Sequence, residues 1–439
     1  MSMRKREEVQ KVLHEEAAEL IASYVDGHEK QFLMNDIRSN AAIVACMDSP
    51  AESHDAPSLL QLFAAFLKLG ATAFGGPAMV AYIRKLAVEK NHWLDDATFK
   101  DGVALCQTIP GATAIQTTAY VGLRVRGLPG AAASFVGFAL PAFCFMLVLS
   151  VFYSQTHELP LVVAAFQGLR AMTVAIVAHA TFIFGKRSLR GAADISIGCL
   201  AAVLFGFKAN PIVVIALAAV LGLLLNRKRT EPAPQAPAKP PASAPSRWRI
   251  TPLLLAAAAG FALLFSMNRG LFDLGALMFK VDLFAFGGGF ASIPVMYHEI
   301  VDVRSWMDGK TFMNGIALGQ VTPGPIVITA TFVGYYVRGI AGAVVATVSV
   351  FLPSFLMVVG VVPYFDRLRS SEYFNRCTSG ILASFVGLLL SVTIQFALGV
   401  SWDIPRILLA GASLTALLLG VDVLWVVLAG VAVALITLK

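Results

Sequence analysis

Charged residues are scarce in this chain. Only 14% of its 439 residues are Asp, Glu, Lys or Arg, whereas 57% are hydrophobic, and an average soluble domain carries about 25% charged residues. This composition excludes an ordinary soluble protein. Apolar stretches of roughly 17–25 residues, long enough to span a bilayer as helices, recur along most of the length. Alternating ten-residue apolar and polar segments, which mark an outer-membrane barrel, are absent. The chain is therefore expected to be an all-α polytopic integral membrane protein.

Sequence patterns for redox, metal and nucleotide chemistry are also missing. The five cysteines and seven histidines show neither CxxC nor HExxH spacing, and no GxxxxGK[ST] loop is present. We therefore expect no cofactor, no resident metal and no bound ATP. The net charge of +7 fits an excess of Lys and Arg in cytoplasmic loops. Nucleic-acid binding is not expected, because it would require a basic face on a folded soluble module.

The apolar segments divide the chain into regions. Residues 1–57 form a charged N-terminal segment that is expected to be cytoplasmic, with no cleavable signal peptide and an amphipathic helix pattern over 4–30. Residues 226–250 are rich in Pro and Ala and basic, as in an extended linker. About thirteen apolar segments are expected to cross the membrane, near 59–80, 103–124, 129–153, 160–184, 192–207, 210–225, 251–268, 274–297, 313–336, 340–362, 377–399, 405–420 and 422–438.

One sequence pattern occurs twice. FLKLGATAFGGPAM at 66–79 matches MFKVDLFAFGGGFA at 278–291, and TAYVGLRVRG at 118–127 matches ATFVGYYVRG at 330–339. Between them, HWLDDATF matches SWMDGKTF and CQTIPGA matches GQVTPGP; beyond them, ALPAF matches FLPSF. This many matches in the same order make chance a poor explanation. The chain is therefore predicted to contain two homologous repeats.

The two repeats cover 58–225 and 269–439, and the apolar segment 251–268 has no counterpart in the first. Six crossings return the chain to the side on which it began, and the extra helix then carries it across. The second repeat is therefore expected to have inverted topology, an arrangement from which many secondary transporters are built. With a cytoplasmic N-terminus, single crossings place the loop around Lys90 outside and the loop around Asp308 inside.

Helix breaks are expected at two places in each repeat. Pro77 removes a backbone donor, and a broken helix in a membrane is tolerated only where it is buried or lines a cavity. The free N–H groups of the next half-helix favour anions. Close helix packing is the alternative reading of the glycine pairs, and structural kinks are the alternative for the Pro-Gly pairs. The candidate anion site comprises Phe74, Gly75, Gly76, Pro77, Gln107, Thr108, Pro110, Gly111, Phe286, Gly287, Gly288, Gly289, Gln320, Thr322, Pro323 and Gly324.

Charged side chains within the apolar segments add to these candidates. Lys68 and Lys280 each lie six residues before a Phe-Gly-Gly sequence. They are expected either to face the anion or to reach back to the membrane interface. Asp282 is a candidate partner of Lys280 or a proton relay. Further candidates for gating, or for anchoring the topology, are Arg124, Arg126 and Arg338.

These motifs resemble the chromate ion transporter family, specifically its long, two-domain members. The resemblance rests on FGGP, FGGG, QTIPG, QVTPGP, YVGLRVRG and FVGYYVRG and covers about 58–439. The two breaks depart from symmetry, because Gly289 stands where the first repeat has Pro77. Residues 1–57 lie outside the resemblance.

The resemblance implies a secondary active transporter, not an enzyme. It would export chromate across the cytoplasmic (inner) membrane and confer chromate resistance. The implied partners are chromate, sulfate as a competing ion of similar shape, the lipid bilayer and, as a candidate assembly, a second copy in a homodimer. The alternatives are a transporter or a passive channel for another oxyanion such as sulfate. A membrane reductase is disfavoured, because no haem, flavin or iron–sulfur ligand pattern is present.

Overall fold

The computed structural model describes residues 57–437 apart from 75–77, 226–249, 366–367 and 369–370. The chain divides into two compact units, Met1–Asp55 and Ala56–Lys439, and every described residue lies in the second unit. The amphipathic helix expected over 4–30 and the extended linker up to residue 249 therefore lie outside the described residues.

The described residues form fifteen α-helices with short π and 3-10 helices, and no β-strand occurs among them, which confirms the all-helical prediction. The first repeat contains α3 (Leu59–Thr72), α4 (Ala78–Arg84), η1 (Lys85–Lys90), α5 (Asp96–Thr108), α6 (Thr113–Thr156), α7 (Pro160–Ser188), α8 (Ala192–Gly206) and α9 (Pro211–Leu225). After α10 (Ile250–Met267), the second repeat contains α11 (Arg269–Leu283), η3 (Gly289–Ala291), α12 (Ser292–Tyr297), η4 (His298–Val303), α13 (Gly309–Val321), η5 (Ile326–Ile328), α14 (Thr329–Val361), η6 (Val362–Tyr364), α16 (Glu372–Gly399), α17 (Ile404–Leu418) and α18 (Val423–Thr437).

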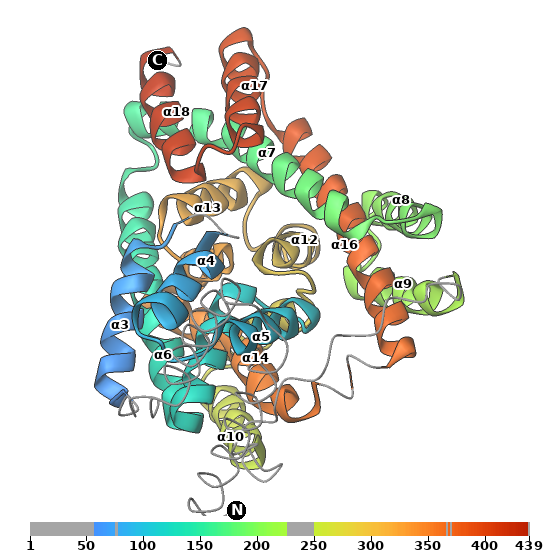
Figure 1. Ribbon diagram of the computed structural model, residues 1–439. Helices are drawn as coiled ribbons and strands as arrows, with labels where there is room; N and C mark the ends of the chain where they lie inside the picture. The colour runs from blue at the N-terminus through green and yellow to red at the C-terminus, as the bar shows by residue number, and fades with distance from the viewer. Residues whose placement is uncertain (1–56, 75–77, 226–249, 366–367, 369–370, 438–439) are drawn as a thin grey trace, which may run out of the picture. The chain divides into compact units, whose positions relative to one another are not determined.

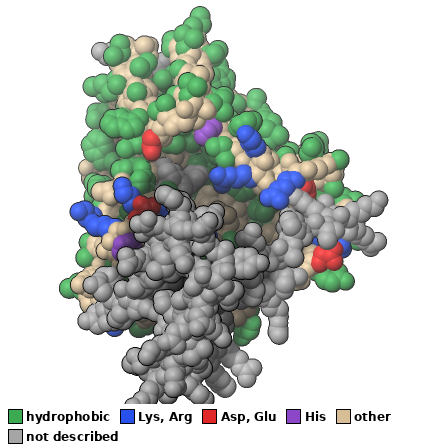
Figure 2. Space-filling model, viewed as in Figure 1, with side chains coloured by type: hydrophobic (Ala, Val, Ile, Leu, Met, Phe, Trp, Pro, Cys, Tyr) green, Lys and Arg blue, Asp and Glu red, His purple; other side chains and the backbone are tan. Residues whose placement is uncertain are grey.

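Several of these helices suit a bilayer. Five spans are long and apolar enough to cross it, namely α6, α7, α10, α16 and the stretch Ile326–Tyr364 that contains α14. The apolar helices α3, α8, α9, α17 and α18 are shorter. No residue of α10 is buried, and Figure 2 shows hydrophobic side chains over much of the described surface on this face. The protein is therefore a multi-pass membrane protein.

Helices α6 and α14 each contain a sharp reversal. Arg126 and Gly127 have φ/ψ of −136°/19° and 64°/−152°, and Arg338 and Gly339 have almost the same values, −142°/22° and 62°/−152°. A positive φ near 60° is available to glycine at little cost. Beyond the first reversal the Ser134 hydroxyl donates to the Thr118 carbonyl at 2.8 Å. Each of these helices is therefore a hairpin of two antiparallel arms.

The segments that carry the predicted breaks also double back. A Cβ added to Gly315 would lie 2.4 Å from the Phe332 ring, and one added to Gly319 would lie 3.0 Å from the Thr329 hydroxyl. Helix α13 and the first arm of α14 are therefore antiparallel. In the first repeat, a Cβ on Gly102 would likewise meet the Tyr120 ring at 2.1 Å.

The same reversal joins the helices on either side of each Phe-Gly-Gly sequence. The Phe66 and Trp93 rings lie 6.2 Å apart although they flank the first break, and Lys280 reaches Glu299 across the second. The structure therefore differs from the prediction of one straight crossing for the segments 59–80, 103–124, 274–297 and 313–336. Hydropathy recorded their apolar length correctly, but the break in each one reverses the chain.

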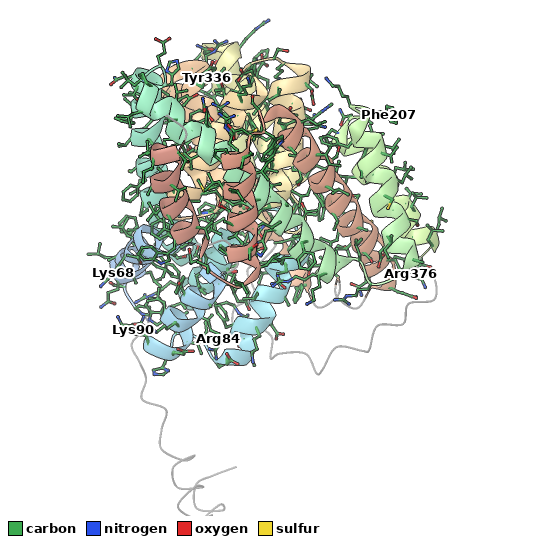
Figure 3. All side chains as sticks on the ribbon, turned by 90° about the horizontal axis from the view of Figure 1, so that it is seen from above. Lys68, Arg84, Lys90, Phe207, Tyr336 and Arg376 are labelled. Atoms are coloured by element: carbon green, nitrogen blue, oxygen red, sulfur yellow. The ribbon has the colours of Figure 1, made fainter. Side chains whose placement is uncertain are left out.

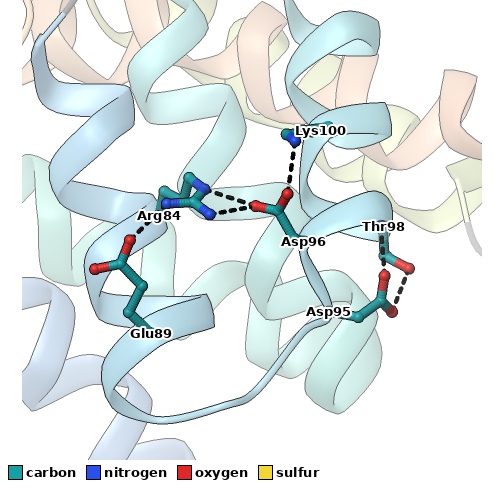
Figure 4. A network of polar contacts seen from close by, with 6 residues as sticks. All are labelled: Arg84, Glu89, Asp95, Asp96, Thr98 and Lys100. Carbon is teal, nitrogen blue, oxygen red and sulfur yellow. Dashed lines mark hydrogen bonds and ion pairs between the residues drawn. The ribbon is translucent and has the colours of Figure 1, made fainter.

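Polar contacts close the loop of the first hairpin (Figure 4). Arg84 contacts Glu89 at 2.5 Å and Asp96 at 2.6 Å. Asp95 caps α5 by accepting from the Thr98 backbone N–H at 2.8 Å, and hydrogen bonds from Thr98 hold the pKa of Asp95 below its ordinary value. In the second repeat Asp308 caps α13 in the same way. The matched aspartates therefore begin matched helices.

The two repeats exchange their C-terminal helices. Helices α8 and α9 of the first repeat pack on α16 of the second, whereas α17 and α18 of the second pack on α7 of the first (Figure 1). The contacts are close because small residues meet at the crossings. A Cβ on Gly380 would lie 2.8 Å from the Gly222 Cα, and one on Gly168 would lie 2.3 Å from the Ala434 Cβ.

The loops gather at two ends of the second unit. Figure 3 shows Arg84, Lys90 and Arg376 toward one end and Phe207 and Tyr336 toward the opposite end. Single crossings had placed Lys90 and Arg376 on different sides of the membrane. The doubled-back segments remove this difference, since the loop around Lys90 returns to the end from which the chain entered.

Candidate functional site

The helix breaks of the two repeats meet each other inside the unit. The Gly111 N–H, in the Pro-Gly break of the first repeat, donates to the Ala285 carbonyl at 2.9 Å, directly before the Phe-Gly-Gly sequence of the second. Reciprocally, the Gly324 N–H donates to the Ala73 carbonyl at 3.1 Å. Each Pro-Gly break therefore contacts the Phe-Gly-Gly region of the other repeat. Sequence matching could not predict this pairing, because it compares the repeats without placing them in space.

Glycine is required at these breaks by backbone geometry and by space. The φ angles of Gly111, Gly287, Gly288 and Gly324 lie between 97° and 119°, a region that L side chains rarely adopt. A Cβ on Gly111 would lie 2.2 Å from the Ser354 hydroxyl, and one on Gly287 would lie 2.0 Å from the Phe184 ring. Side chains of neighbouring helices therefore pack directly against the glycine backbone at Gly111 and Gly287.

A buried polar network lies beside one of the two crossings. The Asp282 carboxylate accepts from the Ser354 N–H at 3.0 Å and from the Ser354 hydroxyl at 2.7 Å. The Ser354 hydroxyl oxygen in turn accepts from the Ala112 N–H at 3.1 Å, one residue after Gly111. Asp282 is fully buried, and its Oδ1 atom has no hydrogen-bond partner. This carboxylate therefore connects α11 to the break of the other repeat.

The other crossing lacks this network. Gly70 stands in place of Asp282, Ala142 in place of Ser354, and Pro325, which has no N–H, in place of Ala112. All three members of the network are therefore missing at once. The sequence search named Asp282 but missed Ser354. A comparison of the repeats could have identified Ser354, because the matched residue in ALPAF is Ala142, which has no hydroxyl.

Two glutamines near the breaks have unpaired polar atoms. Gln116 is buried and donates from Nε2 to the Pro110 carbonyl at 2.5 Å, whereas its Oε1 has no partner. The buried Gln320 Nε2 also has none. Sequence analysis had selected Gln107 instead of Gln116, and Gln107 is exposed.

The remaining break residues lie as follows. The hydroxyls of Thr108 and Thr322 bond to carbonyls of their own helices, at 2.6 and 3.0 Å. Pro110 and Pro323 are buried, and the residues Phe74, Phe286 and Gly289 are half-buried. The residues Gly75, Gly76 and Pro77 lie outside the described part of the chain.

The two matched lysines have different surroundings. Lys68 is exposed and forms no ion pair among the described residues. The Lys280 Nζ lies 2.7 Å from the Glu299 carboxylate, whose side chain is only 5% exposed and which also pairs with Arg304. The matched position in η1 is Leu86. Glu299 was not identified from the sequence, although a comparison of the repeats shows a carboxylate here where the first repeat has a leucine.

The candidate gating arginines lie near the hairpin turns. Arg126 and Arg338 directly precede the positive-φ glycines of the turns, and both are exposed. Arg126 donates to the Pro57 carbonyl at 2.8 Å. The Arg124 guanidinium lies over the Tyr120 ring, 5.4 Å from its centre. Among the described residues no cluster of His, Cys, Asp or Glu could hold a metal.

Comparison with known proteins gives the same division into repeats. A chromate transporter family model matches residues 60–223 and 272–435. The chain is 43% identical over 377 residues to an uncharacterized transporter of Methanocaldococcus jannaschii, covering 86% of this chain and 94% of the relative.

Relatives named as chromate transport proteins are also similar. That of Cupriavidus metallidurans is 32% identical over 83% of this chain and 90% of the relative. That of Pseudomonas aeruginosa is 31% identical over 82% and 86%, respectively. No solved structure matches the chain. With two matched copies that span most of its length, the chain belongs to the chromate transporter family, in its long, two-domain form.

Proposed function

We propose that this protein is a secondary active transporter that exports chromate across the cytoplasmic membrane and thereby confers chromate resistance. Family membership supports transport, and the chromate transport proteins among its relatives support the substrate. The observation that carries the mechanism is the reciprocal contact between the helix breaks of the two repeats. Helices broken at matched places in both halves are typical of a central transport site.

The anion would bind at the breaks through backbone N–H groups. A half-helix that starts inside the unit presents free N–H groups and the positive end of its dipole. In the second repeat these groups follow Gly288, at the start of η3. Chromate is a tetrahedral dianion, so several N–H groups can bind its oxygens together. Gln320, whose buried Nε2 donor has no partner, would add a side-chain contact.

Asp282 is the group that we propose for proton coupling. A buried carboxylate without a cationic partner is costly when it is charged, and no ion pair to Asp282 occurs among the described residues. A proton on Oδ1, the oxygen without a partner, would leave both Ser354 hydrogen bonds to Oδ2 intact. Because the Ser354 hydroxyl also holds Ala112, protonation would act directly on the crossing of the two repeats.

The hairpins suggest a topology of nine crossing helices and four re-entrant helix pairs. The crossings would be the second arms of α6 and α14 together with α7, α8, α9, α10, α16, α17 and α18. Each repeat would contribute two re-entrant pairs, which enter from opposite faces and meet at the breaks. The inverted relation of the repeats is kept, but the loop around Lys90 becomes cytoplasmic and the loop around Asp308 becomes external.

Cysteines introduced at Lys90 and Asp308 should test this topology. With a membrane-impermeant thiol reagent and intact cells, we expect labelling at position 308 and none at position 90, whereas everted vesicles should reverse the result. Thirteen single crossings would produce the opposite pattern with the same cytoplasmic N-terminus. Labelling of both positions from one side would contradict the inverted repeats themselves.

Transport of labelled chromate into everted membrane vesicles tests the proposed function. We expect energised vesicles that contain the protein to accumulate chromate, and an uncoupler to abolish the accumulation. Vesicles without the protein provide the baseline. An absence of accumulation in energised vesicles with confirmed protein would contradict chromate export.

A passive channel or a sulfate transporter is the alternative function. Chromate and sulfate have the same shape and charge, and the N–H groups at the breaks would bind either ion. Excess sulfate in the vesicle assay measures this competition. Chromate flux that is unchanged by the uncoupler would favour the passive channel. Accumulation of sulfate in preference to chromate would favour the sulfate transporter.

A further inference from the structure

A cavity of about 130 Å³ lies where α7, α13 and α17 meet the loop after α16. It is separate from the helix breaks. Three of its six lining residues are cationic and none is acidic. The lining residues are Gln167, Arg170, Lys310, Val400, Ser401 and Arg406.

Arg406 is held in a fixed position at this cavity. Its guanidinium donates to the Gln167 side-chain oxygen and to the Ser401 carbonyl, both at 2.5 Å. Asp403, the N-cap residue of α17, contacts it at 3.2 Å. The Arg406 side chain is only 16% exposed, and its buried Nε has no hydrogen-bond partner. Two hydrogen bonds and one ion pair therefore fix the guanidinium at the cavity.

The other two cations have no carboxylate partner. Arg170 is half-buried and donates from Nε to the Phe166 carbonyl at 3.3 Å. Neither Arg170 nor Lys310 forms an ion pair among the described residues. The Asp308 carboxylate, which caps α13 through the Thr311 N–H at 2.7 Å, also interacts electrostatically with Lys310 and Arg170 over a longer distance. Three cations therefore stand against the two nearby carboxylates of Asp308 and Asp403, and a bound anion would offset the positive charge that remains.

The other repeat provides an internal comparison for this cavity. At the matched crossing none of the three cations is present. The matched pairs are Gln167 with Ser379, Arg170 with Leu382, Lys310 with Ala97, and Arg406 with Asp194.

The helix contact itself is nevertheless preserved. The Ser379 hydroxyl donates to Asp194 at 3.1 Å, in the place where Gln167 accepts from Arg406. The fold therefore makes the same crossing with Leu, Ala and Asp, and packing alone does not require the three cations. Their presence at one end of the unit and absence at the other points to a ligand.

We propose that this cavity binds a tetrahedral oxyanion, of the class of sulfate and chromate. Water in the liquid takes about 30 Å³ per molecule, so the cavity of about 130 Å³ has room for about four waters, one for each oxygen of such an ion. Guanidinium groups match the oxygens of such ions through paired N–H donors. The proposal rests on the proposed function, which it extends by a second anion site. In the topology above, this site opens to the outer side, where an exported ion leaves the breaks.

Protection of a single cysteine from labelling tests the site locally. In a background without the native cysteines, Ser401→Cys places a thiol on the cavity wall while keeping the backbone carbonyl that holds Arg406. The probe is sulfate, because chromate would oxidise the thiol. We expect sulfate to slow maleimide labelling in a saturable way, and chloride at the same ionic strength to have little effect.

Variants that copy the other repeat should weaken this protection. Arg170→Leu and Lys310→Ala are each expected to raise the half-protecting sulfate concentration by about tenfold or more, the effect of losing one charge-assisted hydrogen bond. Lys100→Ala, which removes an exposed cation at the opposite end of the unit, should leave it unchanged. Equal protection by sulfate and chloride, or unchanged protection in both substituted proteins, would overturn the proposed site.

The vesicle assay separates this result from the proposed function. Sulfate protection without chromate accumulation would retain the site and contradict chromate export. Chromate accumulation without sulfate protection would retain export and contradict the site.

Discussion

Replacing Asp282 with asparagine is expected to abolish uphill chromate export and to leave exchange of chromate across the membrane intact. Asparagine keeps the size of the side chain and an oxygen that can accept from Ser354, but it cannot take up a proton. If Asp282 carries the coupling proton, accumulation in energised vesicles should fall by more than about tenfold. Exchange of labelled for unlabelled chromate requires no net proton movement and should continue.

Asp273→Asn is the matched control for this prediction. Asp273 lies on the same helix, α11, and is exposed, so its loss should change neither accumulation nor exchange. The amount of each variant in the membrane must be measured, because asparagine at a buried position also changes hydrogen bonding. Normal accumulation by Asp282→Asn would refute the coupling role. Loss of exchange together with accumulation, at a normal protein level, would indicate a structural role.

Gly111→Ala is expected to remove chromate transport altogether, exchange included. The substitution adds one methyl group at a φ of 119°, and such backbone strain costs about 1–3 kcal/mol. The new Cβ would also lie 2.2 Å from the Ser354 hydroxyl and 2.5 Å from the Gln116 amide nitrogen. Gly111 donates to Ala285 across the repeats, so the displacement would disturb the crossing itself. Chromate accumulation and exchange in vesicles measure both losses.

Gly260→Ala shows whether the loss is specific to the break. Gly260 lies in α10, and an added Cβ there meets no atom within 4 Å. Alanine should therefore be tolerated, and it favours a helix. Comparable transport by the two alanine variants would mean that the crossing does not depend on close backbone approach at Gly111.

The sequence predicted the elements of this fold better than their arrangement. The repeats, the unpaired helix at 251–268 and the breaks beside Pro110 and Pro323 follow from matches between the two halves and from residues that interrupt helices. The direction of the chain beyond a break cannot be predicted in this way. Hydropathy counts apolar residues, so it gives the same value for a helix that doubles back within the membrane and for one that continues across it.

In the candidate site, too, the sequence predicted some residues but not how they are arranged. Four of the selected glycines have a positive φ, and at Gly111, Gly287 and Gly324 an added Cβ would lie closer than 3.0 Å to a neighbouring side chain. Gln107 was selected because it lies just before the Pro-Gly break, and Gln116 was not considered. The order of residues around Pro110 does not tell which glutamine turns inward. The most informative signal was the difference between the repeats, because Asp282, Ser354 and Glu299 each replace an apolar or small residue at a matched position.

The exchange of helices between the repeats has a consequence for biosynthesis. Helix α7 leaves the ribosome long before α17 and α18, which cover its surface. Roughly 250 residues separate the end of α7 from the end of α18, and at ~5–20 residues per second this interval is on the order of ten seconds to a minute. During it, the surface of α7 around Gly168, which α17 and α18 later cover, must face lipid or an insertion chaperone. A nascent chain stalled at the linker would therefore display this uncovered helix surface, which quality-control proteases could recognise.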